Sequence, residues 1–387
     1  MLNLILFFFS PFICFIKSIY DFIKGSNRSL YVFSICIGTL AYLTAPASDL
    51  YPHYILYTSF YNASFSSLYN VEKDVLIPLI DYIFVNNGIN YEWIRFFIST
   101  FQYCTLVYIF NDLTRGYQQR TKILLFLLLI LYSGFFGFVG VRSPLANSFY
   151  FLGVFFIFRK KQNLKGYIFF ALACISHFFF ISVILFTIII KYLKIRHISN
   201  LYFCITLVIC YLVGASLSEF YVTKFFPEQM TYINGYWGNA YVYTLKGYIF
   251  SIIMKYSSIP LIYFFLKNND GDESYRNVIL FLICCLALTI SFNTISSRFL
   301  PLIKYLVIFY YIKNYHQSSR RLQRLVLCAG IIFQASTLYT NRDFLASGNN
   351  NYIAFFQPAI LTFQNTFSDS WIYRHIDSEG LFINSSH

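Results

Sequence analysis

Residues 122–141 read KILLFLLLILYSGFFGFVGV, a run in which only Lys122 carries a charge. An α-helix needs about 20 such residues to cross the hydrocarbon core of a bilayer. Similar runs recur at 200–217, 247–266 and 278–292. The 387-residue chain is 58% hydrophobic and only 12% charged, against about 25% charged in ordinary soluble domains. The sequence therefore predicts an all-α polytopic membrane protein, with one transmembrane domain over 1–387 and about 10–12 transmembrane or re-entrant helices.

Basic residues gather at the ends of the apolar runs. The net charge of +13 therefore reflects membrane topology, and we expect no nucleic-acid partner. With the Lys/Arg-rich connections on the cytoplasmic side, the outer segments are 46–92, which includes a short interfacial helix at 75–85, then 218–246 and the tail 341–387. Residues 1–16 are apolar but have no basic n-region and no small-residue cleavage site, which predicts a retained anchor with its start outside.

One apolar run, at 166–190, has basic clusters at both ends. A single span would place one of these clusters on the outer side. A hairpin of two short helices that turns at Ser176-His177 keeps both clusters inside and puts His177 toward the outer face. Each arm of about 12 residues covers about 18 Å, so the pair would be short or re-entrant.

Four ionisable residues near membrane depth are the candidate functional groups, because such residues are costly in a bilayer. The predicted topology puts Arg142, His177 and Arg298 on the outer side, although they come from separate parts of the chain. Two arginines can bind a phosphate or pyrophosphate by bidentate, charge-assisted bonds, and a histidine can move a proton near neutral pH. Lys255 lies near the middle of the run 247–266.

Each of these residues also has a structural interpretation. Arg142 and Arg298 could be interfacial anchors at helix ends, His177 a helix-turn residue bonded to a carbonyl, and Lys255 a partner of a carbonyl or a lipid phosphate. For Arg298, we expect Ser297 to be the N-cap of the helix and Pro301 to lie in its first turn.

The outer loop 218–246 is rich in aromatic and amide side chains, which suit sugar rings. Trp237, Tyr236 and Asn239 are the candidate sugar-binding residues. An aromatic belt at the lipid interface would show the same composition.

Four motifs resemble those of the EpsG family of exopolysaccharide proteins and, more loosely, the Wzy class of O-antigen and capsule polymerases. They are residues 49–54 (DLYPHY), 141–146 (VRSPLA), 171–180 (ALACISHFFF) and 297–305 (SRFLPLIKY). Ser143-Pro144 replaces the glutamine that usually follows the family's arginine.

The resemblance implies a GT-C-like bundle in the bacterial cytoplasmic (inner) membrane, with its active face outward. The implied activity is a glycosyltransferase that polymerises polyprenyl-pyrophosphate-linked oligosaccharide repeats, with a chain-length regulator as a candidate partner. His177 or Asp49 would be the base. The resemblance implies that Arg142, Arg298 and Lys255 would stabilise the departing pyrophosphate without a metal or other cofactor.

Three other activities remain open at this point. A flippase for lipid-linked oligosaccharides would show internal repeats, and none is evident. A membrane acyltransferase would place a polar partner beside its histidine, whereas His177 is followed by three phenylalanines. An O-antigen ligase shares the polymerase chemistry and is not separated from it by these residues.

Overall fold

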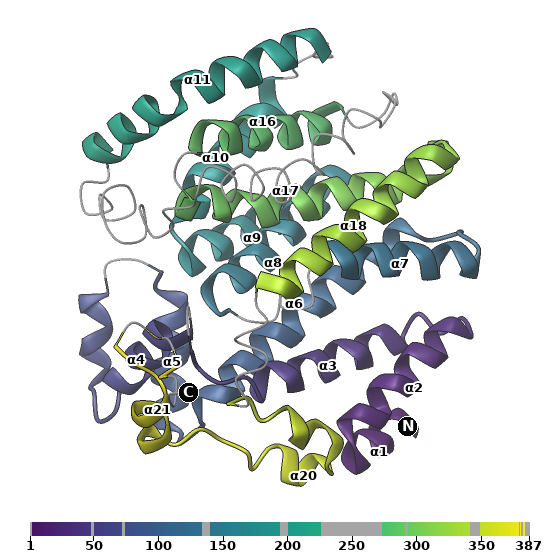
Figure 1. The fold of residues 1–387 in the computed structure, drawn as a ribbon. Coiled ribbons are helices and arrows are strands. Elements are labelled where there is room, and N and C mark those ends of the chain that lie inside the picture. The colour runs from purple at the N-terminus through teal and green to yellow at the C-terminus, as the bar shows by residue number, and fades with distance from the viewer. Residues whose placement is uncertain are drawn as a thin grey trace. The chain divides into compact units, whose positions relative to one another are not determined.

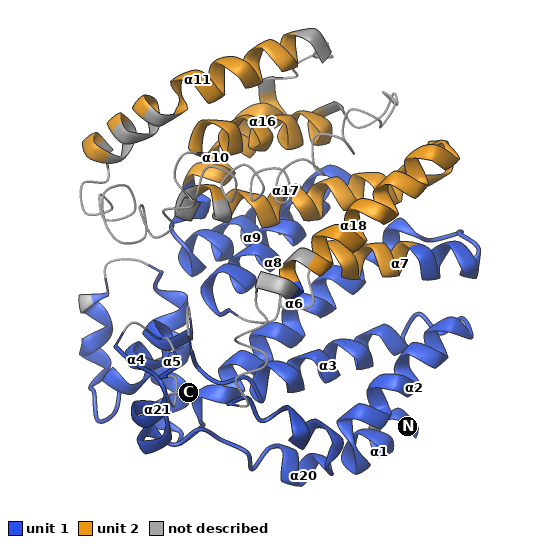
Figure 2. Ribbon diagram, in the orientation of Figure 1, with its two compact units in different colours: residues 1–124, 135–181, 338–387 blue, residues 125–134, 182–337 orange. Residues whose placement is uncertain are grey.

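A computed structural model describes residues 2–47, 50–71, 74–133, 140–193, 200–225, 273–290, 293–340, 349–378, 380 and 382–383. Within these ranges the fold is all-helical (Figure 1), and the β-bridge between Ile376 and Phe382 is isolated. The chain divides into two compact units (Figure 2), one of residues 1–124, 135–181 and 338–387, the other of residues 125–134 and 182–337. Among the described helices, none combines the length and the hydropathy that a membrane crossing requires.

The first unit holds most of the described helices. They are α1 (Leu2–Phe9), α2 (Pro11–Ile23), α3 (Ser29–Tyr42), α4 (Tyr51–Ser59), η2 (Phe65–Asn70), α5 (Leu76–Asn86), α6 (Tyr91–Leu113), α8 (Arg142–Val154), the π-helical turn η3 (Phe155–Arg159), α9 (Asn163–Ser176), η6 (Tyr352–Phe356), α20 (Ala359–Thr362) and α21 (Asp369–His375). Helix α3 packs along α6, and α8 packs along α9.

The second unit contains α11 (Asn200–Phe225), α16 (Glu273–Thr289), α17 (Asn293–Lys313), η5 (Tyr315–Gln317) and most of α7 (Gln119–Ser133), α10 (Phe179–Leu193) and α18 (Arg320–Thr340). Helix α16 packs against both α11 and α17. Pro301 lies inside α17, eight residues after its first described residue. The predicted cap at Ser297 is therefore wrong, because the helix already runs through that position. Pro301 has no backbone N–H, so the Ser297 carbonyl lacks its usual helical donor.

The apolar N-terminal run is two helices rather than one anchor. Ser10 has an extended backbone and its hydroxyl accepts a hydrogen bond from the Ile13 amide, while Pro11 begins α2. This serine cap followed by proline ends one helix and starts the next. The Asn3 side chain donates to the Asp21 carboxylate at 3.1 Å, so α1 folds back along α2. The start of the chain lies beside the end of α2, which contradicts the single anchor.

The helix break predicted at Ser176-His177 is confirmed. Helix α9 ends at Ser176, His177 has an extended backbone, and α10 begins at Phe179. The short helix predicted at 75–85 is α5. The segment 46–92 contains α4 and η2 as well as α5, so it is more structured than one interfacial helix. Whether this segment, the loop 218–246 and the tail 341–387 face outward stays a prediction.

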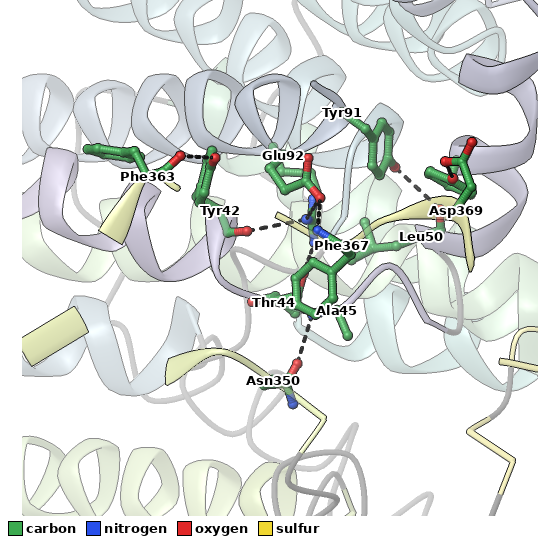
Figure 3. Close-up of polar contacts among 12 residues, drawn as sticks. Tyr42, Thr44, Ala45, Leu50, Tyr91, Glu92, Asn350, Phe363, Phe367 and Asp369 are labelled. Carbon is green, nitrogen blue, oxygen red and sulfur yellow. Dashed lines mark hydrogen bonds and ion pairs between the residues drawn. The ribbon is translucent and has the colours of Figure 1, made fainter. Parts of the chain in front are cut away.

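The C-terminal tail is bonded to the ends of α3 and α6. In Figure 3, the Asn350 side chain accepts from the Ala45 amide at 2.8 Å, and the Tyr42 hydroxyl donates to the Phe363 carbonyl at 2.7 Å. The Glu92 carboxylate accepts from the Phe367 amide at 2.9 Å. Beneath this layer Arg95, which is 1% exposed, donates to the carbonyls of Tyr42 and Thr44.

Candidate functional site

Four polar side chains from four separate segments of the first unit meet in one cluster. Arg142 is the first residue of α8, His53 lies in α4, Asp74 immediately precedes Val75 and α5, and His177 lies between α9 and α10. We call these residues the Asp74 cluster. His53, Asp74 and His177 are buried, whereas the Arg142 side chain is 35% exposed. Arg142 is therefore the member of the cluster that a ligand can reach most directly.

Asp74 joins the other members of the cluster. Its Oδ2 accepts a hydrogen bond from Arg142 Nη1 at 2.8 Å, and its Oδ1 accepts from the Phe178 amide at 2.7 Å. Nδ1 of His177 lies 3.4 Å from Oδ1. The Asp74 carboxylate thus fixes both the start of α8 and the α9–α10 break.

The backbone at both edges of the cluster has unusual conformations. Asp74 has φ = 58°, in the left-handed region that aspartate tolerates better than most residues. Gly140 has φ = 153°, and a Cβ there would lie 3.1 Å from Pro144 in the first turn of α8. The glycine lets the chain turn tightly into the helix that Arg142 begins. Strained backbone of this kind is often found at functional sites.

The electrostatics of the cluster favour a charged aspartate and a neutral His53. Burial opposes ionisation of Asp74, but the contacts with His177, the Phe178 amide and Arg142 together lower the pKa of Asp74 below its ordinary value. Burial, with a further contribution from the positive Arg142, lowers the pKa of His53 to about 3. A neutral His53 can accept the hydrogen bond that Arg142 Nε donates to its Nε2 at 3.2 Å.

This arrangement can move a proton and bind an anion. A carboxylate beside one imidazole nitrogen orients the ring and stabilises its protonated form, so a proton taken up by His177 would go to Nε2. A guanidinium has five N–H donors, and Arg142 uses two of them, for His53 and Asp74. The other three can bind phosphate oxygens.

The structure brings together two of the predicted site residues, Arg142 and His177, through Asp74. Arg298 lies in α17 of the second unit, where it is half-buried, and its convergence with the other two stays a prediction. The other predicted residues lie outside the described ranges: Asp49, Lys255, Tyr236, Trp237 and Asn239. Among the described residues, no group of three or more His, Cys, Asp or Glu side chains is arranged to hold a metal ion.

Sequence reasoning missed His53 and Asp74 as members of the site. His53 stands within the motif at 49–54, in which the resemblance implies a role for Asp49 alone. Asp74 stands in the polar stretch 70–74 (NVEKD), where an acidic residue gives no signal of its own. The polar contact between Asp74 and residues about 70 and 100 positions later has no local sequence signal, because it depends on how α5, α8 and α9 pack.

The comparisons with known proteins gave one match. The sequence model described as the EpsG family matches residues 30–355. No curated protein and no solved structure matches the chain. The matched range includes all four residues of the Asp74 cluster.

Proposed function

The chain belongs to the EpsG family, and from this premise we propose that it joins polyprenyl-pyrophosphate-linked oligosaccharide repeats into a surface polysaccharide. Family membership associates the chain with polysaccharide biosynthesis of the polymerase kind and with a membrane location. The specific reaction and its place at the outer face of the bacterial cytoplasmic membrane are our proposal. The Asp74 cluster is the single observation that carries it.

In the proposed reaction the growing glycan on its lipid is the donor, and the non-reducing sugar of a new lipid-linked repeat is the acceptor. A hydroxyl oxygen of the acceptor attacks carbon 1 of the donor's first sugar. The bond from carbon 1 to that oxygen forms, and the bond from carbon 1 to the pyrophosphate oxygen breaks. The acceptor's proton must leave, and the pyrophosphate carries away the electron pair with its negative charge. A base and a source of positive charge are therefore required.

We assign the role of base to His177, with Asp74 as its positioning residue. Nδ1 lies 3.4 Å from the Asp74 carboxylate, at an ion-pair distance, and the negative charge would stabilise the imidazolium that forms when Nε2 accepts the proton. The partner that an acyltransferase histidine would need is thus present as well, so the histidine alone does not separate the two activities. Asp49, outside the described ranges, remains the alternative base.

Arg142 is proposed to bind the pyrophosphate with its three remaining N–H groups. The charge of Arg142 is balanced by that of Asp74, so this ion pair carries no net positive charge. This balance limits how much the cluster alone can stabilise a departing pyrophosphate. The proposal therefore includes Arg298 and Lys255 as further cations, in a reaction that needs no metal or other cofactor.

The acceptor sugars would contact Tyr236, Trp237 and Asn239 in the loop 218–246. The protein would be multi-pass, with its active face outward, and its partners would be the lipid-linked repeat, membrane lipid and a chain-length regulator. These assignments rest on the family and the sequence pattern.

The test is a polymerisation assay with the purified protein in lipid nanodiscs and a lipid-linked repeat as the probe. The wild type is expected to give a ladder of products. His177→Asn and Arg142→Ala should leave single repeats and reduce the ladder at least about 100-fold, since a general base contributes about 10²–10⁴ in rate.

Arg159→Ala is the matched control, because Arg159 also pairs with an aspartate, Asp112, but lies outside the cluster. A ladder of unchanged length in both cluster variants overturns the assignment. Movement of the repeat across the bilayer without any product would instead support the flippase.

A further inference from the structure

The N-terminal helices of the first unit line an open cavity of about 520 Å³, within the range of about 300–1,000 Å³ typical of small-molecule sites. Helices α1, α2 and α3 form its walls, and Figure 1 shows them lying together. Phe7, Phe8, Val32 and Ile35 line its apolar part. They come from the last turn of α1 and from the first two turns of α3.

The other part of the cavity is polar and basic. It is lined by Lys17 in the middle of α2, by Asp21 near its end, and by Arg28 just before α3. Lys17 and Asp21 form an ion pair, and Asp21 also accepts a hydrogen bond from Asn3. Arg28 is exposed, and its side chain has no ion pair or hydrogen bond to the described part of the chain, while its carbonyl accepts from the Tyr31 amide. These three charged residues together leave one uncompensated positive charge, on Arg28.

We propose that this cavity binds an anionic diacyl phospholipid. The phosphate would lie between Arg28 and Lys17, and an acyl chain would follow Phe7, Phe8, Val32 and Ile35. A headgroup with one negative charge matches the one uncompensated positive charge. Basic pockets between helices on the cytoplasmic side of membrane proteins bind anionic headgroups, and the segment 17–28 is the first basic connection that the sequence assigns to that side.

The cavity shares no residue with the Asp74 cluster. Lys17, Asp21 and Arg28 all precede residue 30, where the match to the EpsG family begins, whereas Val32 and Ile35 lie inside it. The lipid site goes beyond the proposed polymerisation and requires none of its steps.

Lipid binding can be measured on the full chain in a non-ionic detergent by native mass spectrometry, with phosphatidylglycerol as the probe and phosphatidylcholine as the neutral comparison. Phosphatidylglycerol should bind more tightly than phosphatidylcholine. Arg28→Gln should weaken phosphatidylglycerol binding about fivefold, the contribution expected of one basic residue near an anionic lipid. Val32→Trp should abolish binding of both lipids, because the larger side chain fills the apolar part.

Lys24→Gln is the matched control. Lys24 lies in the same basic segment, over the ring of Tyr20, and does not line the cavity, so its loss should leave the affinity unchanged. Equal affinity of the wild type and Arg28→Gln, or equal affinity for the two phospholipids, overturns the proposal. Tighter binding of a polyprenyl phosphate than of phosphatidylglycerol also overturns the proposal. The cavity would then be a binding site for the lipid part of the substrate. The lipid-binding experiment contains no lipid-linked oligosaccharide repeat. A negative result there therefore does not bear on the proposed polymerisation, which the polymerisation assay tests separately.

Discussion

Replacement of Asp74 by asparagine removes one charge from the centre of the cluster while keeping its shape. Asparagine also tolerates the left-handed backbone that Asp74 adopts. The variant leaves Arg142 without its ionic partner. Breaking a fully buried ion pair costs about 3–5 kcal/mol, and an exposed one about 0–1 kcal/mol. Asp74 is 5% exposed and Arg142 35%, so we expect a loss of about 1–3 kcal/mol in the free energy of unfolding.

The effect on catalysis should be larger than the effect on stability. In a Ser-His-Asp triad the same aspartate-to-asparagine change lowers the rate about 10⁴-fold, because the histidine takes the wrong tautomer. The separation of 3.4 Å between His177 and Asp74 is longer than a strong hydrogen bond. We therefore expect Asp74→Asn to reduce polymerisation by about 10²–10³-fold.

The assay is the product ladder. Thermal unfolding is measured as well, so that the activities of the variant and the wild type are compared at a temperature at which both are folded. If His177 acts through Asp74, the double variant Asp74→Asn with His177→Asn should be no slower than His177→Asn alone. Asp112→Asn is the control, since Asp112 pairs with Arg159 and Lys160 outside the cluster. Full activity of Asp74→Asn, or fully multiplicative losses in the double variant, would refute the reasoning.

Two further predictions concern pH. His53 stays neutral in the folded protein down to about pH 3, whereas in the unfolded chain it binds a proton near pH 6.5, so stability should fall by about 2 kcal/mol from pH 7 to pH 5. His53→Gln should flatten this dependence in thermal unfolding, and an equally steep fall in the variant would contradict the buried neutral histidine. Asp81 is fully buried without a hydrogen-bond partner among the described residues, and burial raises its pKa to about 8; stability should therefore fall as the pH rises from about 4 to 8. Asp81→Asn should gain up to about 4 kcal/mol at pH 7, and an unchanged melting temperature there would show that Asp81 is ionised at little cost.

The parts of the fold with local signals were predictable from the sequence. The break at Ser176-His177 followed from basic clusters at both ends of one apolar run, and the all-helical class followed from the apolar runs themselves. The division of the first helix at Ser10-Pro11 also had a local signal, a cap residue before a proline, which the overall hydropathy obscured. Pro301 gave the opposite error, because a proline in a first turn and a proline within a packed helix look alike in sequence.

The site was only half predictable, for a physical reason. Arg142 and His177 stood out because each is a charged or titratable group beside apolar sequence. Asp74 lies in a polar stretch where an acidic residue is ordinary, and its importance comes from contacts with residues far along the chain. Its left-handed backbone and its buried carboxylate are visible only once α5, α8 and α9 are packed.

The docked tail also determines when the protein can finish folding during its synthesis. The Ala45 amide bonds to a residue 305 positions later, and Tyr42 to one 321 positions later. Contacts of such separation form only after most of the chain has left the ribosome. The Ala45 amide and the Tyr42 hydroxyl, at the end of α3, therefore lack these partners until the last part of the chain has been synthesised. A nascent chain released before residue 350 would lack the partners of both Ala45 and Tyr42, so a truncation at the end of the chain would be felt at the helices that were made first.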